Sequence, residues 1–230
     1  MPVPAVDFLI VTSPDALQRT PDPSAYGSDV RPGIVVLISG AGSTMAAVLA
    51  ATQDPTYPAR IAAVGSDTPN AAGLAIAREA GIQTFVVRPS DYQDRAVWSE
   101  ALADQVAAFD PALVLSAGFM RILAPVFIDR FSPRVLNSHP ALLPAFPGAH
   151  GVADALAYGA KVTGATVHVV DAGVDTGPIV AQTCVPVTPH DDVDTLHERI
   201  KVAERAMLVD VVGRVAAGTI SVVGRKVTLV

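Results

Sequence analysis

The feature that most constrains the fold is a short, unbroken run of apolar residues that recurs between helical patterns. Residues 34–38 read Ile-Val-Val-Leu-Ile, which is typical of a strand buried on both faces. Further segments with the pattern of strands, some interrupted by a polar residue, follow at 61–65, 84–87, 113–115, 135–136, 167–170 and 179–187. Because helical stretches separate most of these runs, we expect an α/β fold with a mostly parallel twisted sheet flanked by helices.

Four segments have the sequence pattern of helices. Residues 43–53 are rich in alanine, and residues 71–80 end at Gly81, a common residue just past a helix. Apolar residues recur at helical spacing over residues 98–109 and again over 193–211. We therefore expect helices over these four segments.

The remaining segments suggest how the chain is organised. Residues 219–223 and 226–230 predict a small C-terminal β hairpin, and the proline-rich residues 140–150 predict a loop. Residues 1–33 are rich in proline and show little periodicity, so we expect a poorly ordered leader. We find no internal repeat and no linker beyond it, and we expect residues 34–230 to form a single domain.

Composition narrows the classes of function. Half of the residues are hydrophobic and 17% are charged, as in a globular enzyme. A net charge of -6 without any run of Lys or Arg argues against a nucleic-acid partner. The apolar residues 8–11 are too few to span a membrane. A lone cysteine, Cys184, allows no internal disulfide and favours a cytoplasmic location, and the five scattered histidines predict no metal site.

The main candidate for chemistry is the segment Leu-Asn-Ser-His-Pro at residues 136–140. Strand alternation places Asn137 and His139 on one face, and Asp175 of a later Asp-Thr-Gly-Pro segment can supply a carboxylate. An amide, an imidazole and a carboxylate together can stabilise an oxyanion and move a proton. Each residue alone is explained equally well by hydrogen bonds to loop backbone, so the hypothesis depends on all three. We reject an aspartic protease motif at Asp175, because that site needs a paired aspartate in an all-β fold.

A second candidate is the glycine-rich segment Ser-Gly-Ala-Gly-Ser-Thr at residues 39–44, between the first expected strand and helix. Glycines allow a ligand to approach the backbone, and the free N–H groups of a helix start favour phosphate. The segment is not a P-loop, because no Gly-Lys-Ser/Thr follows, and Met45 does not fit a dinucleotide fingerprint. A tight turn is the alternative interpretation. We favour binding of a small phosphate monoester.

Other residues carry weaker signals. His168 lies on an expected strand and His150 in the proline-rich loop, and a structural role explains either of them. Residues 117–123, Ala-Gly-Phe-Met-Arg-Ile-Leu, follow an expected strand and can form a slot for a flat ring. Lys201 and Glu204 lie beside the apolar stripe of the long helix, where they can meet phosphate and a substrate amine or hydroxyl.

Taken in order, these motifs resemble the folate-dependent formyltransferase family, and within it the phosphoribosylglycinamide formyltransferases of purine biosynthesis. The similarity extends from about residue 34 to the end of the chain. It implies a formyltransferase fold with a Rossmann-like N-terminal half. It also implies transfer of the formyl group of 10-formyltetrahydrofolate to glycinamide ribonucleotide, with no metal, by a cytoplasmic protein that can form a homodimer.

The resemblance also implies a role for individual residues. The implied catalytic residues are Asn137, His139 and Asp175, with His168 supporting them. The residues implied to hold glycinamide ribonucleotide are Gly42, Ser43, Thr44, Lys201 and Glu204. The residues implied to hold 10-formyltetrahydrofolate are Arg95, Met120, Arg121, Ile122, Leu123, Asn137, Asp171, Val174 and Asp175.

The chain departs from the family pattern at two positions. Thr44 stands where the family often has Asn, which affects one expected hydrogen bond to phosphate. Val152 stands where the family often has a second histidine two residues after His150. A role for residues 150–152 therefore stays open.

Three rival functions predict different domains or motifs in the chain. A methionyl-tRNA formyltransferase is expected to carry a further C-terminal domain with a basic surface. A formyltetrahydrofolate deformylase is expected to carry a regulatory domain before the catalytic one, which 33 proline-rich residues do not supply. A nucleotide-binding module without catalysis would keep the glycine-rich segment, but the complete set of Asn137, His139 and Asp175 argues against it.

Overall fold

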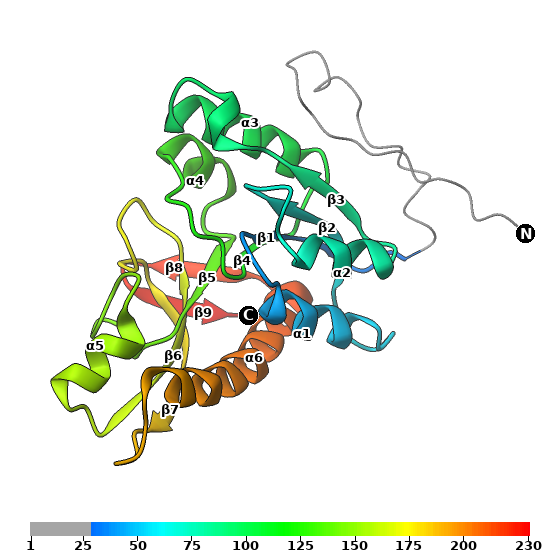
Figure 1. The fold of residues 1–230 in the computed structure, drawn as a ribbon. Coiled ribbons are helices and arrows are strands. Elements are labelled where there is room, and N and C mark those ends of the chain that lie inside the picture. The colour runs from blue at the N-terminus through cyan, green and yellow to red at the C-terminus, as the bar shows by residue number, and fades with distance from the viewer. Residues whose placement is uncertain (1–28) are drawn as a thin grey trace, which may run out of the picture.

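A seven-stranded sheet forms the centre of the part of the chain that the computed structural model describes, residues 29–230 (Figure 1). Its strands are β1 (Gly33–Ile38), β2 (Arg60–Ser66), β3 (Gln83–Val86), β4 (Leu113–Ser116), β5 (Val135–His139), β6 (Val162–Val169) and β7 (Ile179–Pro186). A separate two-stranded sheet consists of β8 (Ile220–Val223) and β9 (Lys226–Leu229). Of the expected leader at residues 1–33, residues 1–28 lie outside the described part of the chain.

The sheet is parallel in its first part and antiparallel in its second. Its strand order is β3-β2-β1-β4-β5-β6-β7, and the pairs from β3 to β5 are parallel. Strands β6 and β7 are antiparallel to their neighbours. The predictions of a mostly parallel sheet and of a C-terminal hairpin are confirmed. The change of direction occurs beside β5, the strand that carries Asn137 and His139.

Six α-helices and a short 3-10 helix accompany these strands within residues 29–230. They are α1 (Ser43–Thr52), α2 (Gly73–Glu79), η3 (Pro89–Asp91), α3 (Arg95–Ala107), α4 (Pro125–Phe131), α5 (Gly151–Tyr158) and α6 (Val193–Ala217). The four predicted helices are present, and α6 is longer than its apolar stripe indicated. The short elements η3, α4 and α5 were not predicted.

Helices cover both faces of the sheet. On β1, the side chains of Ile34, Val36 and Ile38 join a core with α1, α2 and α6. The side chains of Val35 and Leu37, which alternate with them, join a second core with α3 and α4. Figure 1 shows α3 and α4 on one side of the strands and α1 and α6 on the other. A strand buried on both faces is what an unbroken apolar run predicts.

Both ends of the described chain pack against the rest of the fold. The guanidinium of Arg31 donates hydrogen bonds to the backbone oxygens of Thr52, Asp54 and Tyr57. The hairpin β8–β9 packs partly buried apolar residues against the core that contains α1 and α6. Among residues 29–230, no helix is long and apolar enough to cross a membrane.

Candidate active site

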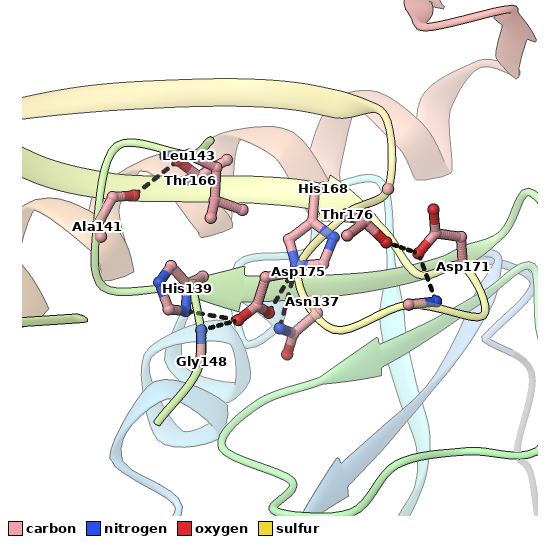
Figure 2. A network of polar contacts seen from close by, with 12 residues as sticks. Asn137, His139, Ala141, Leu143, Gly148, Thr166, His168, Asp171, Asp175 and Thr176 are labelled. Carbon is pink, nitrogen blue, oxygen red and sulfur yellow. Dashed lines mark hydrogen bonds and ion pairs between the residues drawn. The ribbon is translucent and has the colours of Figure 1, made fainter. Parts of the chain in front are cut away.

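The site is built on the end of β5. Asn137 and His139 alternate along this strand, so that both side chains project on the same side, as expected from the sequence. The neighbouring strand β6 places His168 directly opposite Asn137. The Nδ2 atom of Asn137 lies 3.2 Å from Nε2 of His168 (Figure 2). The register of one strand pair thus brings an amide and two imidazoles together.

A carboxylate reaches this group from the loop between β6 and β7. Asp175 Oδ2 lies 3.3 Å from Nδ1 of His139, and Oδ1 lies 3.5 Å from Nε2 of His168. Figure 2 shows the carboxylate between the two rings. Asp175 has a φ of 55°, in the left-handed region that few non-glycine residues occupy. The structure therefore brings together all four residues that the resemblance implied to be catalytic.

Three backbone groups complete the polar network. The N–H of Gly148 donates to Asp175 Oδ2 at 2.8 Å, and Phe146 O lies 2.8 Å from Nε2 of His139. Val169 O lies 3.0 Å from Nδ1 of His168. None of these partners was predicted. For Phe146 and Gly148, the only sequence signal was that both lie in the proline-rich loop. In the structure Gly148 has a φ of 92°.

The hydrogen-bond partners of His139 determine where its protons are. Both ring nitrogens face oxygen acceptors, Nε2 the carbonyl of Phe146 and Nδ1 the carboxylate of Asp175. A neutral ring carries one N–H, so it would place a lone pair against one of these oxygens. A ring with two N–H groups satisfies both acceptors. The ring of His139 is therefore held between a backbone carbonyl and a carboxylate.

The environment of Asp175 favours its ionised form. A hydrogen bond from His168 is the main cause that lowers the pKa of this carboxyl, against the opposing effect of burial. The N–H of Gly148 and the positive charges of His139 and His168 lower the pKa further. Asp175 is thus held as an acceptor and counter-ion between the two rings.

Thr166 anchors the loop that follows β5. Its hydroxyl donates to Ala141 O at 2.7 Å and accepts from the backbone N–H of Leu143 at 3.0 Å (Figure 2). The amide of Gln182 on β7 donates to the same hydroxyl oxygen and to Leu143 O. Strands β6 and β7 therefore fix the start of the proline-rich loop that supplies Phe146 and Gly148. Residues 140–150 contain no helix or strand, as predicted.

The glycine-rich segment forms the tight turn between β1 and α1. Gly42 is the N-cap of α1 with a φ of 73°, and a Cβ atom there would lie 2.7 Å from Cα of Gly73. No side chain caps this helix start, so N–H groups of its first turn stay available to a ligand. Ser43 is exposed and Thr44 half-buried. The local geometry suits an anion.

Lys201 and Glu204 lie on α6, the helix that packs against α1. Glu204 is buried, whereas the ammonium of Lys201 forms an ion pair with Glu198 at 2.8 Å on the same helix. Burial lowers the pKa of the neighbouring His197, and the charge of Lys201 adds to this effect. A charged edge therefore borders the apolar stripe of α6.

The residues implied to hold the folate fall into several environments. Met120 and Ile122 are 78% and 52% exposed, whereas Leu123 is buried in the core with α3 and α4. The guanidinium of Arg121 pairs with Asp67, a buried carboxylate at the end of β2. The structure thus leaves part of this segment open and fixes the rest.

The other implied folate residues lie on α3 and on the loop that carries Asp175. Arg95 is the first residue of α3, outside the polar network around Asp175. Asp171 Oδ1 accepts from the hydroxyl of Thr176 at 2.6 Å and from Gly173 N–H at 3.1 Å. Val174 is half exposed. The loop is therefore closed by its own hydrogen bonds and presents an apolar side chain.

A cavity of about 510 Å³ lies between α4 and this loop. Apolar residues such as Pro125, Ile128 and Val170 line it, together with Asp171. Of the residues implied to hold the folate, only Asp171 lines the cavity. Across the described part of the chain, no cluster of three or more His, Cys, Asp or Glu side chains could hold a metal ion.

The chain is similar in sequence and in fold to known proteins. Residues 33–212 match the family model described as formyl transferase. A phosphoribosylglycinamide formyltransferase from Mycobacterium tuberculosis is 58% identical over 197 residues, which cover 85% of this chain and 90% of the relative. A protein of the same name from Bacillus subtilis is 35% identical, over 72% of this chain and 85% of its own length. A crystal structure of glycinamide ribonucleotide transformylase 1 from Symbiobacterium toebii superposes with a TM-score of 0.84 at 40% identity, covering 87% of this chain and 94% of that one.

Proposed function

The chain belongs to the formyl transferase family, and within it to the phosphoribosylglycinamide formyltransferases, and from this we propose its reaction and the roles of its residues. The protein transfers the formyl group of 10-formyltetrahydrofolate to the amine of glycinamide ribonucleotide. The products are formylglycinamide ribonucleotide and tetrahydrofolate, in de novo purine biosynthesis. The observation that carries this proposal is the position of Asp175 between His139 and His168, next to Asn137.

The proposed mechanism is direct acyl transfer. The glycinamide nitrogen forms a bond to the formyl carbon, and the carbonyl oxygen becomes a tetrahedral oxyanion. The amide of Asn137 donates a hydrogen bond to this oxyanion, and His139 as an imidazolium places positive charge beside it. As the bond between the formyl carbon and the folate nitrogen breaks, His139 passes a proton to that nitrogen. Asp175 stabilises the imidazolium and helps to receive the proton that the attacking amine loses.

His168 supports the other catalytic residues. Its Nδ1 atom faces the carbonyl of Val169, which fixes a proton on that nitrogen. Its Nε2 atom lies 3.2 Å from the amide of Asn137 and 3.5 Å from the carboxylate of Asp175, so the ring orients both groups. No covalent enzyme intermediate is needed in this scheme.

We assign the phosphate of glycinamide ribonucleotide to the start of α1. Gly42, Ser43 and Thr44 present backbone N–H and hydroxyl groups there, and a helix N-terminus favours negative charge. Lys201 and Glu204 of α6 hold the rest of the nucleotide. The buried carboxylate of Glu204 suits a hydroxyl or amine, and Lys201 adds positive charge.

We assign 10-formyltetrahydrofolate to the space between residues 118–123 and the loop 171–178. The exposed side chains of Met120, Ile122 and Val174 offer apolar surface for a flat ring. Asp171 of the same loop lines the cavity beside α4. The further residues proposed to contact the folate are Arg95, Arg121, Leu123, Asn137, Asp171 and Asp175.

One assay tests the function against its nearest rivals. The purified protein is mixed with 10-formyltetrahydrofolate, with and without glycinamide ribonucleotide, and the folate absorbance is followed. We expect a change only when the acceptor is present, and no loss of rate in EDTA. A change without the acceptor indicates a deformylase, and no change in either mixture indicates a binding module.

We also propose where and in what form the protein acts. A cytoplasmic location fits its place in purine biosynthesis, and we propose a homodimer of chains that each fold as a single domain over residues 34–230. Light scattering of the purified protein tests the dimer. A mass that stays at one chain over a wide concentration range contradicts it.

A further inference from the structure

A contact far along the chain reaches the loop that carries Asp175. The Nη2 atom of Arg225 donates to Thr176 O at 3.0 Å and to Gly177 O at 3.3 Å. These two carbonyls belong to the residues that directly follow Asp175. Arg225 itself lies in the turn between β8 and β9, well outside the polar network of the site. Arg225 of the C-terminal hairpin therefore binds the backbone next to the carboxylate of Asp175.

The backbone at this point has little freedom to compensate for a lost contact. Asp175 has a left-handed φ of 55°. A Cβ atom on Gly177 would lie 1.7 Å from Val169 O, so this residue packs directly against β6. Such strained positions persist only where the surroundings fix them. The carbonyl oxygens that accept from Arg225 belong to the two residues immediately after Asp175.

The hairpin that carries the guanidinium of Arg225 is held in place by its own hydrogen bonds and by packing. Only Gly224 and Arg225 connect its strands, and Gly224 has a φ of 61°. Mutual backbone hydrogen bonds between Thr219 and Val230 close its open end. The hairpin packs on β7 and on the core with α1 and α6 (Figure 1). Its turn is thus held in place independently of the Asp175 loop.

We propose that Arg225 is a positioning residue, which holds the Asp175 carboxylate between His139 and His168 by fixing the carbonyls of Thr176 and Gly177. This inference rests on the proposed function of the same site. Arg225 touches no reacting atom and acts only through the loop. A displacement of about 1 Å in a catalytic group can cost on the order of a hundredfold in rate, so a loosened loop lowers turnover.

The test compares Arg225→Ala with Lys226→Ala, which removes the adjacent exposed cation of the same hairpin. We expect Arg225→Ala to lower kcat by about tenfold or more, with the KM for both substrates within about twofold of wild type. Lys226→Ala is expected to keep the wild-type kcat. Arg225→Lys keeps a cation with N–H donors and is expected to recover part of the loss. Equal kcat values for the two alanine variants overturn the proposal.

A second measurement separates positioning from general stability. The N–H of Gly148 is bonded to Asp175, so hydrogen exchange at Gly148 reports the place of the carboxylate. We expect faster exchange at Gly148 in Arg225→Ala, without a similar change at core amides such as Val36. Faster exchange everywhere, or an unchanged Gly148, contradicts the proposal. If the alanine variant does not fold, Arg225→Gln is measured in the same way, with the same two outcomes.

Failure of this inference and failure of the proposed function look different. If the wild-type protein transfers no formyl group to glycinamide ribonucleotide, the proposed function is wrong. If the wild-type protein is active and Arg225→Ala keeps its kcat, only the role of Arg225 is wrong. The exchange measurement needs no substrate, so it tests the positioning contact in either case.

Discussion

At the scale of residues, sequence reasoning identified side chains and missed backbone groups. Asn137 and His139 could be paired because strand alternation fixes which side chains share a face. The partners Phe146 O and Gly148 N–H could not, because every residue carries these atoms and only the loop path selects them. Arg225 was missed for a similar reason, since its acceptors are backbone carbonyls in a distant loop.

The oxyanion role of Asn137 gives the first prediction. We expect Asn137→Ala to lower kcat by about a hundredfold to a thousandfold, the usual loss for one oxyanion donor. The KM values change little, because the bond is made mainly in the transition state. Ser138→Ala on the same strand is the control, since alternation turns this side chain to the other face. A loss of less than about threefold in steady-state assays would remove Asn137 from the oxyanion site.

The lowered pKa of Asp175 gives a prediction on pH and stability. The ordinary pKa of an aspartate is near 3.8, and the hydrogen bond from His168 is the main cause that lowers it here. A carboxylate with a lowered folded-state pKa stabilises the fold above the unfolded value, and this stabilisation is lost as the pH falls through the folded value. Asp175→Asn removes the charge, while Asn tolerates the left-handed backbone. We therefore expect this variant to be less stable than wild type at pH 7, and the difference to shrink below about pH 4.

Urea unfolding at pH 7 and at pH 3 measures this effect. Glu79→Gln, at an exposed site on α2, controls for the loss of one negative charge. A stability difference for Asp175→Asn that is the same at both pH values contradicts the prediction. The same variant is expected to lower kcat far more than it raises either KM, because it removes the counter-ion of His139 rather than a substrate contact.

At the scale of elements, the functional residues themselves obscured the sequence pattern. The apolar run that marks β5 covers only 135–136, because Asn137, Ser138 and His139 interrupt it, and the pairing of Asn137 with His139 assumed that the strand continues. These polar residues continue the strand because β4 and β6 supply its ladder on both sides. Tertiary pairing therefore overrode local preference at the point where chemistry requires polar groups.

Sequence reasoning missed the helices α4 and α5 because both are short and because the prolines at or before their starts also suit loops. Helix α4 begins at Pro125, a residue that suits a first helical turn but also a loop. Helix α5 follows the proline-rich loop and spans eight residues. Neither is long enough to show several turns of apolar periodicity. Their stability comes from packing of buried residues such as Phe127 and Val152 into the cores, which the sequence alone does not reveal.

The turn before α1 gives a prediction at this scale. Gly42→Ala places a Cβ 2.7 Å from Cα of Gly73, at a φ of 73° that L side chains rarely adopt. We expect a loss of about 2 kcal/mol or more in the free energy of unfolding, and a higher KM for glycinamide ribonucleotide. Gly40→Ala is the matched control for stability, because its Cβ meets nothing within 4 Å. Thermal unfolding checks the pair, and equal midpoints would contradict the close approach at Gly42.

At the scale of the whole molecule, the site lies where the two parts of the sheet meet. Strand β5 pairs in parallel with β4 on one side and antiparallel with β6 on the other. The parallel part supplies the glycine-rich turn, and the antiparallel part supplies His168 and the Asp175 loop. The strand order reverses one strand away, between β1 and β4, and the crevice at such a point is where open α/β sheets commonly bind ligands. The sequence revealed both sets of motifs, but their meeting point follows from the strand order, which periodicity does not determine.

The two cores share strands, and this gives a prediction for unfolding. Val35 and Val36 are neighbours on β1, yet one packs in the core with α3 and α4 and the other in the core with α1, α2 and α6. Neither core can lose β1 without exposing the other. We therefore expect calorimetry to show one transition, with a calorimetric enthalpy close to the van't Hoff enthalpy. Val35→Ala and Val36→Ala are each expected to cost about 2 kcal/mol and to lower the midpoint of that same transition. Two transitions, each sensitive to only one of these substitutions, would show that the chain folds as two units and would contradict a single domain over residues 34–230.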